Sequence, residues 1–245
     1  MTMTMTIITE LQDIEKRLDQ EGDTAQVRKV FWRIVGKIKR LDPALVDDKV
    51  VEKATAIRNR LFKHKIAISV GRGVAVYFLV FLLSILGYIW ALLFLESTLA
   101  VFIILPPLFA QIILNIVLIL ICVCTAYGFY PMGRFLGGVI ARVKFEGMYR
   151  YSPGELGLKI EYASYLRTTP SRRKWVFGFP IIWVFGILIT LLPITWLLNP
   201  TGVWAPIFII ILFALFYVVI YRMKTGEIYR FVRELRIARE VKRTQ

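Results

Sequence analysis

Residues 175–198 read WVFGFPIIWVFGILITLLPITWLL and residues 203–223 read VWAPIFIIILFALFYVVIYRM, with only NPTG between them. About 20 consecutive apolar residues cross the hydrocarbon core of a bilayer as an α-helix. Both stretches reach that length, and neither has a charged residue in its interior. They predict a transmembrane hairpin over 175–223, with kinks at Pro180 and Pro193.

A second hairpin is predicted upstream, over residues 67–129. Its first span covers Val74 to Leu95. Its second span begins near Pro107, because proline fits the first turn of a helix, and ends near Phe129. The apolar residues 98–105 are left as an interfacial connection. The predicted fold class is an all-α integral membrane protein with four transmembrane helices.

Composition and charge agree with this class. Mean hydropathy is +0.62 and 57% of residues are hydrophobic, which is too apolar for a soluble protein of 245 residues. Of the 32 Lys and Arg residues, 15 precede residue 74, nine lie in 130–174 and eight lie from Arg222 onwards. None lies in the short connections within the two hairpins. The positive-inside rule therefore predicts both termini and the middle loop to be cytoplasmic.

The partners expected from this charge are lipids. The basic residues flank apolar spans, where they attract the anionic inner leaflet of a prokaryotic plasma (inner) membrane. Nucleic acid is not expected as a partner, although the net charge is +15. The segment TPSRRKW places Arg172, Arg173, Lys174 and Trp175 as membrane-surface anchors ahead of the third span.

Residues 1–66 predict a cytoplasmic helical domain. Three apolar stripes recur at helical spacing. They are Ile7, Leu11, Ile14 and Leu18; Val27, Val30, Phe31, Ile34, Val35 and Ile38; and Val46, Val50, Ala54, Ile57 and Leu61. The stripes favour a three-helix bundle that buries them, and the alternative is a docking surface for a partner helix.

Two further polar segments are predicted. In the cytoplasmic loop 130–174, short strands are expected around the turn SPGELG. Residues 224–245 predict a basic amphipathic helix, which either lies along the inner leaflet or packs on the amino-terminal bundle. The chain is thus divided into 1–66, 67–129, 130–174, 175–223 and 224–245.

Few residues point to chemistry. Gln111 and Asn115 lie one helical turn apart in the second span and predict interhelical hydrogen bonds, with a substrate or cofactor contact as the alternative. Cys122 and Cys124 are interpreted as buried small hydrophobes. His64 is the single histidine, and no cluster of zinc-ligand type is visible. We expect no metal, no cofactor and no catalytic residues.

One segment resembles a known family. Residues 130–149, YPMGRFLGGVIARVKFEGMY, resemble the first active-site segment of the site-2 protease family of intramembrane zinc peptidases, which carries His-Glu-x-x-His and, after an apolar helix, a stretch like GVKVEGF. The matching positions are Gly133, Phe135, Leu136, Val143, Lys144 and Glu146.

The motif is degenerate in this chain. Tyr130 and Arg134 stand where the family has its two zinc-binding histidines, and Pro131 stands where it has its glutamate base. Arginine has no lone pair for a metal and proline has no side-chain base. The resemblance therefore implies a protease-like scaffold without the metal. Residues 157–178 and 221–240 are similar to segments of uncharacterised prokaryotic multi-pass membrane proteins.

Three functions follow as expectations. The first is a non-catalytic membrane scaffold or accessory subunit, which has a membrane-protein partner or forms a homo-oligomer. The second is a site-2-protease-like pseudo-enzyme that binds peptide through a strand edge without hydrolysis. The third is a small channel or a lipid or solute carrier, against which the absence of charged residues inside the spans argues.

Overall fold

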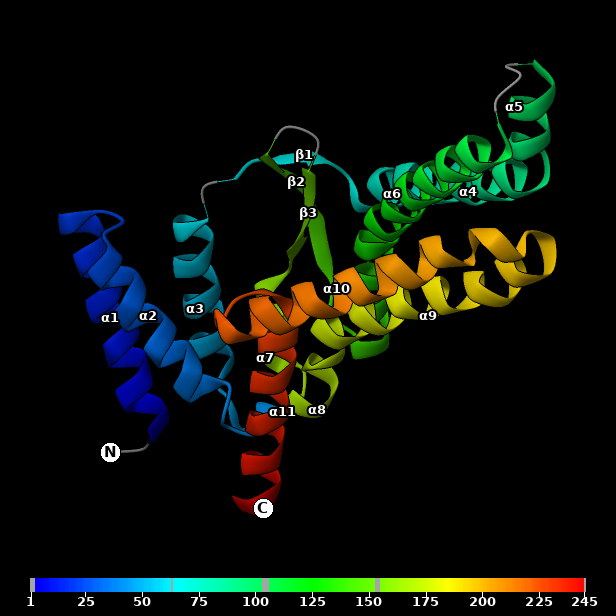
Figure 1. Ribbon diagram of the computed structural model, residues 1–245. Helices are drawn as coiled ribbons and strands as arrows, with labels where there is room; N and C mark the ends of the chain where they lie inside the picture. The colour runs from blue at the N-terminus through cyan, green and yellow to red at the C-terminus, as the bar shows by residue number, and fades with distance from the viewer. Residues whose placement is uncertain (1–2, 63, 103–105, 153–154, 245) are drawn as a thin grey trace. The chain divides into compact units, whose positions relative to one another are not determined.

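The computed structural model describes residues 3–62, 64–102, 106–152 and 155–244. It is 83% helical, and four helices are long and apolar enough to cross a membrane (Figure 1). They cover Val70–Leu99, Leu108–Ala141, Pro170–Leu198 and Pro200–Arg222. The chain divides into two compact units. We call residues 1–70, 138–176 and 231–245 the polar unit, and residues 71–137 and 177–230 the membrane unit.

The first span is longer than predicted. Helix α4 (Val70–Trp90) continues through a π-helical segment, η2 (Ala91–Leu95), into α5 (Glu96–Phe102). The predicted end at Leu95 is therefore wrong, and the predicted connection is helical as far as Phe102, with 103–105 outside the described residues. Hydroxyl groups explain the continuation: Ser97 and Thr98 both donate to the Phe94 carbonyl, at 2.9 and 2.7 Å, which keeps these polar side chains compatible with a helix.

The second span begins at the predicted proline but ends twelve residues later than Phe129. Helix α6 (Pro107–Ala141) runs through Pro131, so the prediction of a loop from residue 130 is wrong for 130–141. An interior proline removes one helical N–H donor. Packing outweighs that loss here, because Gly133 lies directly against the next span.

The second hairpin agrees with the prediction. Helix α9 (Trp175–Leu198) contains both predicted prolines, and α10 (Trp204–Arg222) returns after the short 3-10 segment η3 (Pro200–Val203) (Figure 1). Tyr88 of α4 and Thr195 of α9 share a buried hydrogen bond of 2.6 Å between their hydroxyls. Within the apolar core of this unit Cys122 is buried, whereas Cys124 is exposed, so the prediction of two buried cysteines is wrong for Cys124.

Three helices of the polar unit carry the predicted stripes. They are α1 (Met3–Glu21), α2 (Ala25–Ile38) and α3 (Asp48–Leu61). Ile7, Leu11, Ile14, Leu18, Val27, Phe31, Ile34, Val35, Ile38, Val50, Ala54, Ile57 and Leu61 are all buried. Only Val30 and Val46 are partly exposed. The stripes are therefore buried within the unit, as the three-helix bundle requires, and are not open to a partner helix.

A small sheet completes the polar unit. The predicted strands are β2 (Phe145–Ser152) and β3 (Glu155–Ile160), paired antiparallel, and β1 (Ile66–Ile68), which was not predicted, pairs antiparallel with the other side of β2. After the sheet come the short helices α7 (Tyr162–Arg167) and α8 (Pro170–Arg173). Helix α11 (Gly226–Thr244) contributes residues from Phe231 onwards.

The contact of α6 with α9 gives a testable prediction. A Cβ atom at Gly133 would lie 2.9 Å from Cα of Pro180 and 3.2 Å from Cβ of Trp183. Because backbone cannot yield as a flexible side chain does, we expect Gly133→Ala to cost about 1–3 kcal/mol. The measurement is the thermal unfolding temperature in mild detergent. Gly186→Ala is the matched control, since a Cβ there meets nothing within 4 Å. Equal unfolding temperatures for the two variants would contradict the packing.

Candidate functional site

A buried ionic cluster lies at the centre of the polar unit. Glu234 of α11 has a side chain 0% exposed. Its Oε1 accepts hydrogen bonds from Lys39 Nζ at 2.7 Å and from the Tyr165 hydroxyl at 2.9 Å, and its Oε2 accepts from Arg173 Nε at 3.1 Å. Arg173 also donates from Nη2 to the Lys39 carbonyl at 2.9 Å. One carboxylate thus binds groups from the residue that caps α2, from α7 and from α8.

The charges of this cluster are set by burial and by one another. Burial alone would raise the pKa of Glu234, but Lys39 and Arg173 outweigh it and hold the pKa below its ordinary value of 4.5. Burial, only partly offset by Glu234, lowers the pKa of Lys39 to about 8. Burial also raises the pKa of Tyr165 well above its ordinary value, so its hydroxyl remains a donor. At neutral pH the buried side chains of the cluster carry two cations and one anion, and the half-exposed Arg233 lies 4.0 Å from Glu234 Oε1.

The cluster decides between the two predictions for the carboxyl-terminal helix. Glu234 and Ile237 are buried, so this face of α11 packs within the polar unit, as the second of the two predictions has it. It also changes the role of one predicted anchor. Arg173 is only 1% exposed, so the prediction of a membrane-surface anchor is wrong for this residue. The guanidinium is buried because Glu234 offers it a fixed counter-charge.

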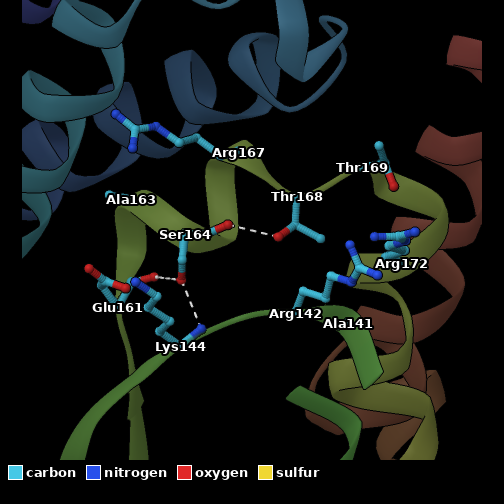
Figure 2. A pocket seen from close by; sticks show the side chains of 10 residues that line it. All are labelled: Ala141, Arg142, Lys144, Glu161, Ala163, Ser164, Arg167, Thr168, Thr169 and Arg172. Atoms are coloured by element: carbon cyan, nitrogen blue, oxygen red, sulfur yellow. Dashed lines mark hydrogen bonds between the residues drawn. The ribbon is translucent and has the colours of Figure 1, made fainter. Parts of the chain in front are cut away.

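A cavity of about 370 Å³ lies in the same unit. Four cationic side chains line it: Arg142, Lys144, Arg167 and Arg172. Three hydroxyl side chains, Ser164, Thr168 and Thr169, and one carboxylate, Glu161, line it as well. Figure 2 shows Arg142 extending toward Arg172 at one end, with Lys144, Glu161 and Ser164 at the other. The lining therefore carries an excess of positive charge.

Hydrogen bonds fix the frame of the cavity but leave most of its cations without a counter-charge. Ser164 Oγ accepts from the Lys144 N–H at 2.9 Å and donates to the Glu161 carbonyl at 2.9 Å. Arg167 turns away to Asp48, at 2.8 Å. Arg142, Lys144 and Arg172 form no ion pair with a carboxylate in the part of the chain that the structure describes.

The degenerate motif lies elsewhere, in the membrane unit. Pro131 and Gly133 are buried, and Tyr130 packs against the apolar core. Arg134 Nη1 lies 3.5 Å from Oε1 of Glu227, in the first turn of α11, and both side chains are largely buried. The arginine of the segment that resembles the peptidase motif thus pairs with a carboxylate. No group of three or more His, Cys, Asp or Glu able to hold a metal occurs among the described residues.

Gln111 and Asn115 differ from the prediction. Asn115 Nδ2 donates to the Gln111 carbonyl of its own helix at 3.0 Å. Gln111 Nε2 and Asn115 Oδ1 are buried without a hydrogen-bond partner in the described chain, so these two groups form no interhelical bond there. The i to i−4 carbonyl is simply the nearest acceptor for an asparagine side chain on a helix.

The remaining predicted anchors separate in the structure. Arg172 is exposed and lines the cavity. Lys174 lies over the ring of Trp175, with Nζ 5.1 Å from the ring centroid.

Comparison with protein-family models, with curated proteins and with solved structures finds no match to this chain. The resemblance of residues 130–149 therefore rests on the sequence segment alone.

Sequence reasoning missed Glu234 and Arg142. Glu234 was detectable in principle, because it interrupts the apolar stripe of Phe231, Leu235 and Ala238 at helical spacing. An acidic residue on the apolar face of an otherwise basic helix indicates a buried cation partner. Nothing in the sequence names that partner, since Lys39 is 195 positions away.

The first prediction from the cluster concerns stability. Removing the charge of Glu234 leaves two buried cations without their anion, so Glu234→Gln should cost roughly 3–5 kcal/mol. Glu240→Gln is the control on the same helix, because its ion pair with Arg40 is about half exposed and such pairs contribute less than ~1 kcal/mol. Thermal unfolding in detergent measures both. Similar losses in the two variants would show that Glu234 has no special role.

The second prediction concerns pH. A carboxylate whose folded pKa lies below 4.5 supplies stability above that pH and loses it as the pH falls, because the unfolded chain binds the proton first. The wild-type advantage over Glu234→Gln in unfolding temperature should therefore be present near neutral pH, where Glu234 is ionised. It should shrink below 4.5. An advantage that is independent of pH down to about pH 3 would contradict the assignment.

Proposed function

We propose that this protein is a non-catalytic multi-pass membrane scaffold or accessory subunit, whose polar unit is a rigid platform for a partner within a larger membrane complex. The observation that carries the proposal is the cluster around Glu234. It joins residues from α2, the α7–α8 region and α11 into one unit, so that segments before, between and after the four candidate spans form a single body.

The internal packing supports this role. The bundle helices bury their own apolar stripes, so the platform does not need a partner in order to fold. Some large apolar side chains nevertheless remain on its surface: Trp32 is 51% exposed and Leu45 is 76% exposed. Exposed tryptophan is typical of the centres of protein interfaces. The positive-inside rule favours a cytoplasmic position for this platform, and we propose a prokaryotic plasma membrane as its location.

The test is purification in mild detergent from the membranes of its own cells, followed by native mass spectrometry. We expect a membrane-protein partner at a fixed ratio with the wild-type chain. Trp32→Ala should reduce the amount of partner severalfold, because half of this side chain is exposed. The comparison is made at equal amounts of folded protein, since the Trp32 ring also packs edge-on against Phe31 and Tyr162. Arg33→Ala, at an exposed position one residue further along α2, is the control.

Other outcomes would replace the proposal. A chain that purifies alone and gives solute or lipid flux in liposomes would be a channel or carrier. A chain that carries one zinc per molecule and cleaves peptides would be a peptidase, with ligands other than Tyr130 and Arg134. A chain that purifies alone and does neither would also contradict a scaffold role.

A further inference from the structure

The strongest unused feature of the molecule is the imbalance of charge in the cavity. Arg142 follows the last residue of α6, and Arg172 lies three residues before α9 begins. Both guanidinium groups line one cavity, and neither has a carboxylate partner in the described chain. Two like charges in one site repel each other unless an anion lies between them. The positive end of the α9 dipole is also unfavourable for a cation such as Arg172.

The backbone at Arg142 strengthens this argument. Its φ of 60° is left-handed, a conformation usually adopted by glycine. The residue closes a Schellman cap, in which the Val143 N–H donates to the Gly138 carbonyl at 2.8 Å and the Arg142 N–H donates to the Val139 carbonyl at 3.0 Å. An arginine at this position adds strain that glycine would avoid, and directs a guanidinium into the cavity (Figure 2).

The end of α10 provides a comparison for the cap at Arg142. Lys224 also has a left-handed φ, of 54°, and it closes an equivalent cap at the end of α10. A cation at the carboxyl end of a helix is favoured by the helix dipole, which accounts for both residues. Lys224 does not line the cavity, however, and it has no counterpart of Arg172. The pairing of two arginines in one cavity is therefore the feature that the cap leaves unexplained.

The opposite end of the cavity has a different character. There Glu161 and Lys144 lie beside Ser164, and Thr168 donates its hydroxyl proton to the Ser164 carbonyl at 2.8 Å (Figure 2). A carboxylate accepts hydrogen bonds from hydroxyl groups and repels a second anion. This end therefore fits the hydroxyl groups of a ligand, whereas the arginine end fits an oxyanion with several acceptor oxygens.

We propose that this cavity binds a phosphate ester of a small polyol, with Arg142 and Arg172 on the phosphate and Glu161 and Lys144 on the hydroxyl groups. Its volume of about 370 Å³ suits a ligand of that size. The same chemistry occurs in the headgroup of a phosphatidylglycerol-type lipid and in a soluble molecule such as glycerol phosphate. Arg142 directly follows one candidate span, and Arg172 is the third residue of another.

The experiment separates the two sources. The protein is purified in neutral detergent and offered phosphatidylglycerol, phosphatidylcholine or soluble glycerol phosphate, with retention scored by native mass spectrometry and affinity by calorimetry. One retained phosphatidylglycerol, not displaced by glycerol phosphate, identifies the lipid as the source. Saturable binding of glycerol phosphate, without preference for phosphatidylglycerol over phosphatidylcholine, identifies the soluble ester. Either result supports the site, and binding of neither ligand overturns it.

The variants link binding to the two arginines. Arg142→Gly relieves the left-handed strain, so it should raise the unfolding temperature while weakening binding about tenfold or more. Lys224→Gly is the matched control, which should also raise the unfolding temperature but leave binding unchanged. Arg172→Gln should weaken binding to a similar degree. Equal losses in the Arg142 and Lys224 variants would show attraction to net charge only, and would overturn the proposal.

Discussion

Glu234 accepts hydrogen bonds from Lys39, Tyr165 and Arg173 in a place that water does not reach. Removing charges from water is costly, and the cost is offset only where the counter-charge and the hydrogen bonds are both in place. Each partner reaches the carboxylate from a different part of the chain, and the rest of the polar unit depends on that meeting. The bundle alone would leave Lys39 without this anion.

The sequence predicts what depends on composition and local spacing. Helix α9 begins and ends where predicted, because about 20 apolar residues between polar ends leave few alternatives in a membrane protein. The three stripes of the bundle are likewise buried as their period requires. The end of α6 is different. Pro131 predicts a break, but Gly133 permits close contact with Pro180, and that contact is invisible in a single sequence.

The candidate site likewise combines a feature that the local sequence predicts with features that depend on distant parts of the chain. Arg172 is conspicuous in the sequence because it belongs to a basic run ahead of a span, and its position suggests contact with lipid. Arg172 lies in the same cavity as Arg142 because the sheet and α7 lead the chain from the end of α6 back to the start of α9. The role of Arg173 depends on Glu234, far along the chain. Arg172 and Arg173 are thus neighbours in the sequence, but Arg172 is exposed and Arg173 is buried.

The separation of Lys39 and Glu234 by 195 positions has a consequence for biosynthesis. A ribosome makes Lys39 first and Glu234 only after all four candidate spans have emerged. Until then Lys39 and Arg173 both lack their counter-ion, Glu234. The polar unit can therefore be completed only after all four candidate spans have been made. A chain arrested between the hairpins would lack Glu234, and its incomplete polar unit would be less stable. In cells, lower stability exposes a chain to chaperones and proteases.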